Sequence, residues 1–227
     1  MGELKVLGLI PARAGSKSIL NKNLVNLGEK PLISWTISAA LASKLDRVVV
    51  STNDRQIAEV SQKYGAEVPF ERPTNLSEDS SLSIDVVLHA LEVLEHEFDA
   101  VMLLQPTSPF RTSEDINLAL DLFPDVSSVI SVVPVDGNHP ARMKFIQDGF
   151  LIDPPFSEEV ENMPRQKLTP MFIRNGAIYL TRVSVLKSRT FKGSRCRALV
   201  MSKERSLNID TSFDLLIARA MLDGGLI

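Results

Sequence analysis

The chain has a single cysteine, three histidines and no long apolar run among its 227 residues. One cysteine cannot form an internal disulfide, and no Cys/His spacing typical of a zinc site occurs. No stretch approaches the roughly 18 consecutive apolar residues of a membrane-spanning helix. The net charge is −3 and the basic residues are dispersed, so nothing predicts nucleic acid as a partner. The segment before Pro11 is too short for a signal peptide, and we expect a cytoplasmic protein without membrane contact.

The common glycine-rich nucleotide signatures are also missing. Neither the Walker A spacing nor the G-x-G-x-x-G dinucleotide pattern occurs. Hydrophobic residues make up 44% and charged residues 23% of the chain, which is ordinary for a globular protein with one core. We therefore expect one domain over residues 1–227.

Short apolar runs alternate with helical patterns through residues 1–135. The runs predict buried strands at 5–12, 47–52, 100–105 and 127–135. The segments between them predict helices at 31–43, 54–64, 81–97 and 113–123. This alternation predicts an α/β fold with a doubly wound, mainly parallel, Rossmann-like sheet that binds ligands beyond the carboxyl ends of its strands.

The pattern changes after Val135. Asp148-Gly149 stands between two apolar segments, 144–147 and 150–152, which predicts a β-hairpin. Because four prolines follow closely, residues 140–170 are expected to form an arm outside the core, with a long surface loop as the alternative. Further strands are expected at 172–180 and 198–201, and a closing helix at about 212–224.

The residues after the first expected strand have the composition of a phosphate-binding turn. Small residues let backbone N–H groups approach a ligand, and three cations, Arg13, Lys17 and Lys22, are spaced through the turn. Polar turns also follow the strands at 47–52 and 100–105, and all three should meet in one crevice. A solvated basic loop is the alternative for the first turn taken alone.

The first turn in detail reads Ile10-Pro11-Ala12-Arg13-Ala14-Gly15-Ser16-Lys17, followed by Lys22-Asn23-Leu24. It resembles the signature of the CMP-sialic acid synthetases, or acylneuraminate cytidylyltransferases, which include bacterial legionaminate and pseudaminate enzymes. Further blocks resemble this family in the family's order, at residues 50–54, 71–73, 85–91, 104–111 and 174–179. The resemblance thus covers nearly the whole chain.

The resemblance implies a fold of the nucleotide-diphospho-sugar transferase type, with a small arm that reaches over the partner subunit in a homodimer. It implies a reaction in which the anomeric hydroxyl of a nine-carbon α-keto acid sugar attacks the α-phosphorus of CTP and expels pyrophosphate. The sugar would be N-acetylneuraminate, legionaminate or pseudaminate. Catalysis should come from positioning and cations, and such chemistry usually uses Mg²⁺, or Mn²⁺.

The same resemblance assigns site residues. The expected catalytic residues are Arg13, Lys17, Lys22 and Asp210. The expected nucleotide contacts are Ala12, Arg13, Ser16, Lys17, Lys22, Asn23, Arg72 and Ser81. The expected sugar contacts are Gln105, Arg142, Arg165, Arg174 and Tyr179, with His139 approaching from the arm. If the arm is swapped between subunits, Arg142 and Arg165 would enter the partner's site.

The expected metal site departs from the family's pattern. The family's Asp-x-Asp reads Asn208-Ile209-Asp210 here, so we expect Asp210 to be the metal ligand, with Asp54 as a helper. Asn208 can offer only a neutral carbonyl oxygen, which should weaken a second metal.

Simpler assignments remain open. Asp210 could serve only as a helix cap, Arg72 could form a salt bridge with Glu71 or Glu78, and the arm arginines could be surface charges. Two rival functions also remain. One is a synthetase for the eight-carbon acid Kdo, whose usual Ser-Thr-Arg-Leu-Pro-Gly-Lys loop is absent here. The other is a catalytically silent nucleotide-binding module. Asn208 in place of the family's Asp favours this alternative, whereas the retained cations Arg13, Lys17 and Lys22 argue against it.

Overall fold

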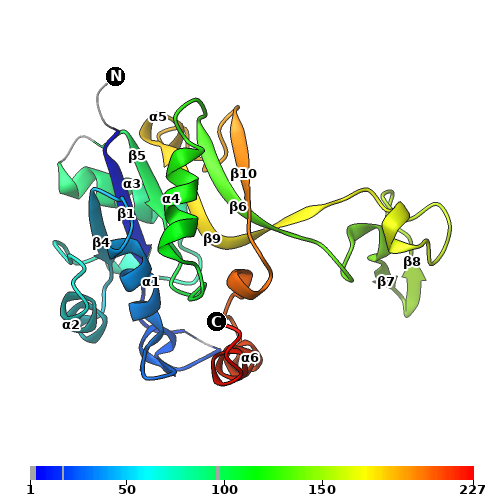
Figure 1. Ribbon diagram of the computed structural model, residues 1–227, viewed down its shortest axis with the longest axis horizontal. Coiled ribbons are helices and arrows are strands. Elements are labelled where there is room, and N and C mark those ends of the chain that lie inside the picture. Colours follow the sequence, from blue (N-terminus) through cyan, green and yellow to red (C-terminus); the bar gives the residue numbers. More distant parts are fainter. Residues whose placement is uncertain (1–3, 17, 96–97) are drawn as a thin grey trace.

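The computed structural model describes residues 4–16, 18–95 and 98–227. A six-stranded sheet in the order β10-β6-β9-β5-β1-β4 forms its centre (Figure 1). The strands are β1 (Val6–Pro11), β4 (Arg47–Ser51), β5 (Ala100–Leu103), β6 (Ser128–Pro134), β9 (Phe172–Arg182) and β10 (Cys196–Val200). Two separate strand pairs are β2 (Asn26–Leu27) with β3 (Lys30–Pro31), and β7 (Phe145–Gln147) with β8 (Phe150–Ile152).

The central sheet is mainly parallel. β1 pairs in parallel with β4 and β5, and β6 pairs in parallel with β10. β9 lies between β5 and β6 and is antiparallel to both. The predicted α/β class and the predicted strands are confirmed, whereas the reversed direction of β9 was not part of the prediction.

Helices cover both faces of this sheet. The α-helices are α1 (Leu32–Leu41), α2 (Arg55–Lys63), α3 (Ser83–Leu94), α4 (Ser113–Asp121), α5 (Val183–Leu186) and α6 (Ser212–Asp223). Short 3-10 turns are η1 (Lys22–Leu24), η2 (Thr74–Leu76), η3 (Pro140–Arg142), η4 (Arg165–Lys167) and η5 (Glu204–Ser206). In the part of the chain that the structure describes, no helix is long and apolar enough to cross a membrane.

Side-chain caps explain where several helices begin. Asp54 accepts a hydrogen bond of 2.9 Å from the backbone N–H of Ile57 and so caps α2. A reciprocal capping box of Thr112 and Asp115 begins α4. The same arrangement of Thr211 and Asp214 begins α6. Each cap satisfies N–H groups of a first helical turn, which have no partner inside the helix.

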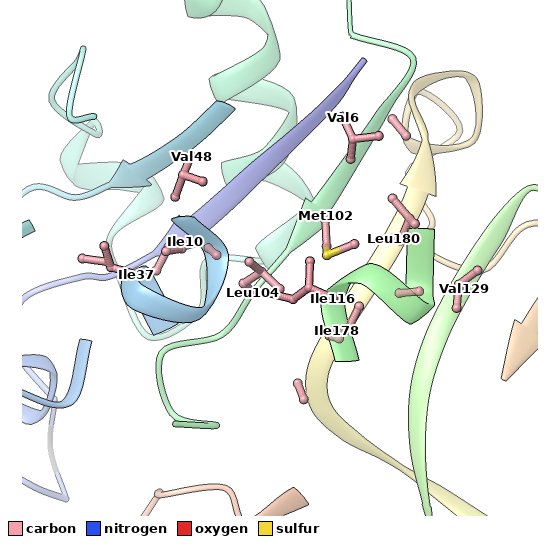
Figure 2. Close-up of a cluster of buried hydrophobic side chains, with 14 of the residues drawn as sticks. Val6, Ile10, Ile37, Val48, Met102, Leu104, Ile116, Val129, Ile178 and Leu180 are labelled. Atoms are coloured by element: carbon pink, nitrogen blue, oxygen red, sulfur yellow. The ribbon is translucent and has the colours of Figure 1, made fainter. Parts of the chain in front are cut away.

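Alternate residues of β1 enter two different apolar clusters. Val6 and Ile10 pack with α1 and α4, whose Ile37 and Ile116 meet side chains of β1, β5 and β9 (Figure 2). Leu7 and Leu9 pack on the opposite face, where α3 and α5 lie. Burial on both faces explains why the strand reads as a continuous apolar run.

The chain leaves the sheet after β6 and returns in β9, and residues 135–171 between them form an arm that projects from the domain (Figure 1). The predicted hairpin is confirmed as β7 and β8. Asp148 and Gly149 at its turn have φ values of 50° and 84°, which Asp and Gly adopt more readily than other residues. Within the arm, the His139 ring bonds to the Thr169 carbonyl oxygen at 3.0 Å and accepts the Ala141 N–H at 3.2 Å.

Candidate active site

A pocket of about 350 Å³ opens beyond the carboxyl ends of β1 and β5. Its wall combines four stretches of the chain: the turn after β1, the segment from 72 to 86, the turn after β5 and the segment before α6. Parallel neighbouring strands bring the first and third of these stretches to the same edge of the sheet. We call this cavity the main pocket.

Two hydrogen bonds hold the turn after β1. The buried Asn23 donates a hydrogen bond of 3.1 Å from Nδ2 to the carbonyl oxygen of Arg13. The backbone N–H of Ala14 donates to Asn53 Oδ1 at 3.1 Å. Asn53 comes from the polar turn after β4, which therefore braces the first turn and does not line the main pocket. The expectation that all three turns share one crevice is correct for two of them.

Most of the expected nucleotide contacts converge here. Arg13, Ser16, Lys22, Asn23, Arg72 and Ser81 all line the main pocket. Ala12 lies at the end of β1 and is fully buried, with its N–H bonded to the Ser51 carbonyl oxygen at 2.9 Å. Lys17 lies outside the described residues.

Two arginines give the main pocket its positive wall. Arg13 forms an ion pair with Asp79, which also lines the pocket. Arg72 is only 3% exposed, and its Nε and Nη2 atoms have no hydrogen-bond partner among the described residues. A salt bridge from Arg72 to Glu71 or Glu78 is therefore not what the structure shows. Burial, together with the charge of Arg13, lowers the pKa of Arg72 from its ordinary value to about 10, so the side chain stays charged at neutral pH.

Lys22 connects the first turn to the segment before α6. Its Nζ donates to the Ile209 carbonyl oxygen at 3.1 Å and lies 3.0 Å from Asp210 Oδ1. The N–H of Ile209 donates in turn to the Thr107 carbonyl oxygen at 2.7 Å. Three walls of the main pocket are thus joined directly.

Asp210 does not cap α6, because Thr211 and Asp214 form the cap. Its side chain is 62% exposed and lines the main pocket together with Asn208. Asn208 donates from Nδ2 to Asp210 Oδ2, while its Oδ1 is buried and has no partner among the described residues. The expected helper Asp54 lies elsewhere, as the cap of α2.

A carboxylate and an amide oxygen are the kind of ligands that Mg²⁺ prefers. The unpartnered Oδ1 of Asn208 and the exposed carboxylate of Asp210 therefore fit such an ion. No group of three or more His, Cys, Asp or Glu residues able to hold a metal occurs in the described ranges. A metal at Asp210 would need most of its ligands from water and from a bound phosphate.

Gln105 lies in the wall formed by the turn after β5. Gly176 of β9 has a φ of 79°, and a Cβ on it would come within 2.7 Å of Gln105 Oε1. Gly176 thus gives the Gln105 side chain room to lie against β9. The sequence reasoning did not identify this contact, because it joins residues that are far apart along the chain.

The other expected sugar contacts do not reach the main pocket within one chain. Arg142 donates to the Met163 carbonyl oxygen at 2.7 Å, and Arg165 pairs with Asp136, both in the arm. Arg174 is exposed on the part of β9 that pairs with the end of β6. Tyr179 packs against Phe191 with ring centroids 5.6 Å apart, in the apolar cluster on the α3 face. The structure therefore offers no support for a sugar contact by Tyr179 in its own chain.

Comparison with known proteins agrees with this geometry. A family model described as cytidylyltransferase matches residues 7–141. The chain belongs to this cytidylyltransferase family. It is 35% identical to CMP-N,N'-diacetyllegionaminic acid synthase of Legionella pneumophila, over 97% of each chain. It is 33% identical to pseudaminic acid cytidylyltransferase of Campylobacter jejuni, over 96% of each chain.

Another member of the cytidylyltransferase family is longer. N-acylneuraminate cytidylyltransferase of Escherichia coli is 34% identical over 94% of this chain, but the match spans only 51% of that relative. The fold also matches CMP:2-keto-3-deoxy-manno-octonic acid synthetase complexed with CTP, with a TM-score of 0.73 over 97% of this chain and 99% of that one, at 18% identity. The fold also matches 4-diphosphocytidyl-2C-methyl-D-erythritol synthase of Anaerococcus prevotii, with a TM-score of 0.68 over 97% of this chain and 96% of that one, at 14% identity. The expected type of fold is thereby confirmed.

Replacing Arg72 with Met should weaken phosphate binding without lowering the stability of the protein. We expect the free energy of unfolding in urea to stay the same or rise, because a buried guanidinium with unpartnered nitrogens costs free energy. Binding of inorganic tripolyphosphate, measured by calorimetry, should weaken about tenfold or more. Arg55→Met on the exposed face of α2 is the control. A loss of more than about 2 kcal/mol of stability with unchanged binding would make Arg72 a structural residue.

Proposed function

We propose that this protein is a cytidylyltransferase that joins CTP to a nine-carbon α-keto acid sugar, giving the CMP-sugar and pyrophosphate. The observation that carries the proposal is the main pocket, which brings Arg13, Lys22 and Arg72 together with Asn208 and Asp210 around one cavity. Two relatives that match over nearly their full length are named for legionaminic and pseudaminic acid, which supports this substrate class.

The cations would bind the triphosphate. Arg13 and Lys22 lie on the turn after β1, and each already has an anionic partner, Asp79 and Asp210 respectively. The phosphates of CTP would take the place of Asp79 beside Arg13. Attack at the α-phosphorus spreads negative charge over the phosphoryl oxygens, and fixed cations stabilise that charge more in the transition state than in the substrate.

Asp210 and Asn208 would hold Mg²⁺, or Mn²⁺, through their side-chain oxygens. When bound, such an ion polarises the phosphates and neutralises their charge. Lys22 lies 3.0 Å from Asp210 Oδ1, so it would hold this carboxylate oriented toward the main pocket. Because Asn208 carries no charge, metal binding would depend strongly on the phosphates of CTP.

The sugar would lie near Gln105, whose side-chain amide can both donate and accept hydrogen bonds with hydroxyl or acylamino groups. Among the described residues of one chain, no further arginine lines this side of the main pocket, since Arg142 and Arg165 lie in the arm. A second copy of the chain would supply them if its arm reached over this pocket.

The apolar surface of the arm supports such a homodimer. Large apolar side chains are exposed along the arm, among them Phe145, Ile146, Phe150, Leu151, Phe156 and Val160. Extended apolar patches are uncommon on monomers and usually mark contact surfaces. In the proposed dimer, each arm covers the partner and brings Arg142 and Arg165 to the partner's main pocket. The cytoplasmic location and the lack of a nucleic-acid partner stay predictions.

Pyrophosphate release tests the reaction directly. The purified protein is incubated with CTP, Mg²⁺ and one of four acids: N-acetylneuraminate, legionaminate, pseudaminate or Kdo. We expect release with CTP and a nine-carbon acid, and none when ATP, GTP or UTP replaces CTP. Release with Kdo alone would favour the eight-carbon alternative. Silence in folded protein that binds CTP would favour the silent module, and Asn208→Asp would then be the variant to assay.

Replacing Asp210 with Ala should lower kcat by about 10²-fold or more, because this carboxylate acts on charge that develops in the transition state. The fold should be unaffected, since Thr211 and Asp214 cap α6 without it. Asp121→Ala, at the exposed end of α4, is the control. An Asp210→Ala enzyme with the original kcat would remove Asp210 from the proposed chemistry.

Charged substitutions in the arm should dissociate the dimer. Ile146 and Leu151 are paired across β7 and β8 and are both exposed, so we expect Ile146→Asp with Leu151→Asp to sediment at the chain mass of 25.1 kDa. The unsubstituted protein should sediment at twice that mass. Leu118→Asp, an exposed apolar position on α4, is the matched control. A monomeric unsubstituted protein would contradict the proposed dimer.

A further inference from the structure

A charged side chain lies in the core behind the main pocket. Arg111 follows the turn after β5 and is only 2% exposed. Its Nη1 donates to the Ala177 carbonyl oxygen at 2.6 Å, and its Nη2 donates to Thr36 Oγ1. Both Nη atoms also lie 3.3 Å from the Gln105 carbonyl oxygen. One guanidinium therefore joins α1, β9 and the turn that carries Gln105.

This charge is costly to bury. Burial lowers the pKa of Arg111 from its ordinary value to about 9, while the negative charge of Asp115 acts in the opposite direction. An apolar side chain of similar size would fill the same space without hydrogen bonds to the three acceptor oxygens. What the guanidinium adds is a fixed geometry, because its planar donors hold several acceptors in defined directions.

Asp115 connects Thr112, the residue after Arg111, to the opposite wall of the main pocket. It is 4% exposed, and its Oδ2 accepts the Thr112 N–H at 3.1 Å in the capping box of α4. Its Oδ1 lies 3.3 Å from Arg205 Nη1 in η5. The chain runs from η5 directly into Asn208 and Asp210.

A neutral contact runs alongside this ionic one. Asn175 of β9 donates from Nδ2 to Ser206 Oγ at 2.9 Å, also in η5. Its Oδ1 accepts the N–H of Ala177, the residue whose carbonyl Arg111 binds. The turn with Gln105 and the segment with Asp210 are thus attached to one buried framework.

We propose that Arg111, Asp115 and Arg205 are positioning residues, which set the Gln105 wall of the main pocket at a fixed separation from the Asn208-Asp210 wall. None of the three lines the main pocket, so they act through the residues that do. The proposal rests on the proposed function, in which the sugar lies at one wall and the metal-held phosphate at the other. Transfer needs the reacting atoms about 3 Å apart, and a displacement of about 1 Å can cost ~10²-fold in rate.

Arg205 is the residue to change, because it is partly exposed and its loss leaves Arg111 in place. In Arg205→Gln we expect kcat to fall about tenfold while KM for CTP stays within about twofold. The melting temperature should match that of Arg55→Gln, a control that removes an ion pair with Glu59 on α2. Arg205→Lys keeps the charge and should recover most of kcat.

Hydrogen exchange of the free protein supplies a readout that does not depend on activity. In Arg205→Gln the amides of Ile209 and Asp210 should exchange about tenfold faster than in Arg55→Gln, because their segment has lost one attachment. Thr36→Val, which removes one acceptor of Arg111, should speed exchange in the turn at 105–108. This second variant tests the framework if Arg205→Gln does not fold.

The outcomes separate the two proposals. An unsubstituted protein that makes no CMP-sugar contradicts the proposed function, and hydrogen exchange then decides the positioning role by itself. If Arg205→Gln equals Arg55→Gln in exchange and in kcat, the positioning role is overturned. A raised KM for CTP with unchanged kcat would also overturn it, since Arg205 would then contribute to binding and not to geometry.

Discussion

The antiparallel strand β9 is the element on which this architecture depends. In the described sheet it joins two groups of parallel strands, β4-β1-β5 on one side and β6-β10 on the other. Its pairing with β5 fixes the position of the strand that leads into the turn with Gln105. Its pairing with β6 fixes the position of the base of the arm. At its middle, Gly176 adopts a left-handed conformation, and the neighbouring Asn175 and Ala177 bind the polar groups behind the main pocket. The arm, the central sheet and the main pocket are therefore all connected through β9.

Much of the fold could be predicted because its signals are local. Continuous apolar runs identify strands covered on both faces, and residues such as Thr112, Thr211 and Asp148-Gly149 indicate caps and a turn through their own backbone geometry. The direction of β9 in the sheet depends on the path of the arm before it. A short stretch of sequence around β9 does not reveal that path. Side-chain direction along β9 was equally hidden, because the pairing with β6 shifts register between Ile130 and Val132. The expectation for Tyr179 came from the family resemblance of its block, whereas the structure packs its ring on the α3 face.

Some residues of the candidate site could likewise be predicted from local sequence, and others could not. The turn after β1 and the Asn208-Asp210 pair could be recognised from adjacent residues, and the structure brings them to one pocket. Arg111 could not be recognised, since an arginine after a turn reads as a surface residue, and its burial depends on acceptors in α1 and β9. The role of Lys17 stays a prediction, and so do the metal and the dimer.

The cap of α6 has a consequence for how this site can change. Thr211 and Asp214 satisfy the first turn of the helix by themselves, so neither Asn208 nor Asp210 is needed to begin it. The residues that cap the helix and the residues proposed to hold the metal are therefore adjacent but separate. In the proposed metal site, substitutions at 208 and 210 would alter which ion is held, and how strongly, while the cap of the helix stays in place.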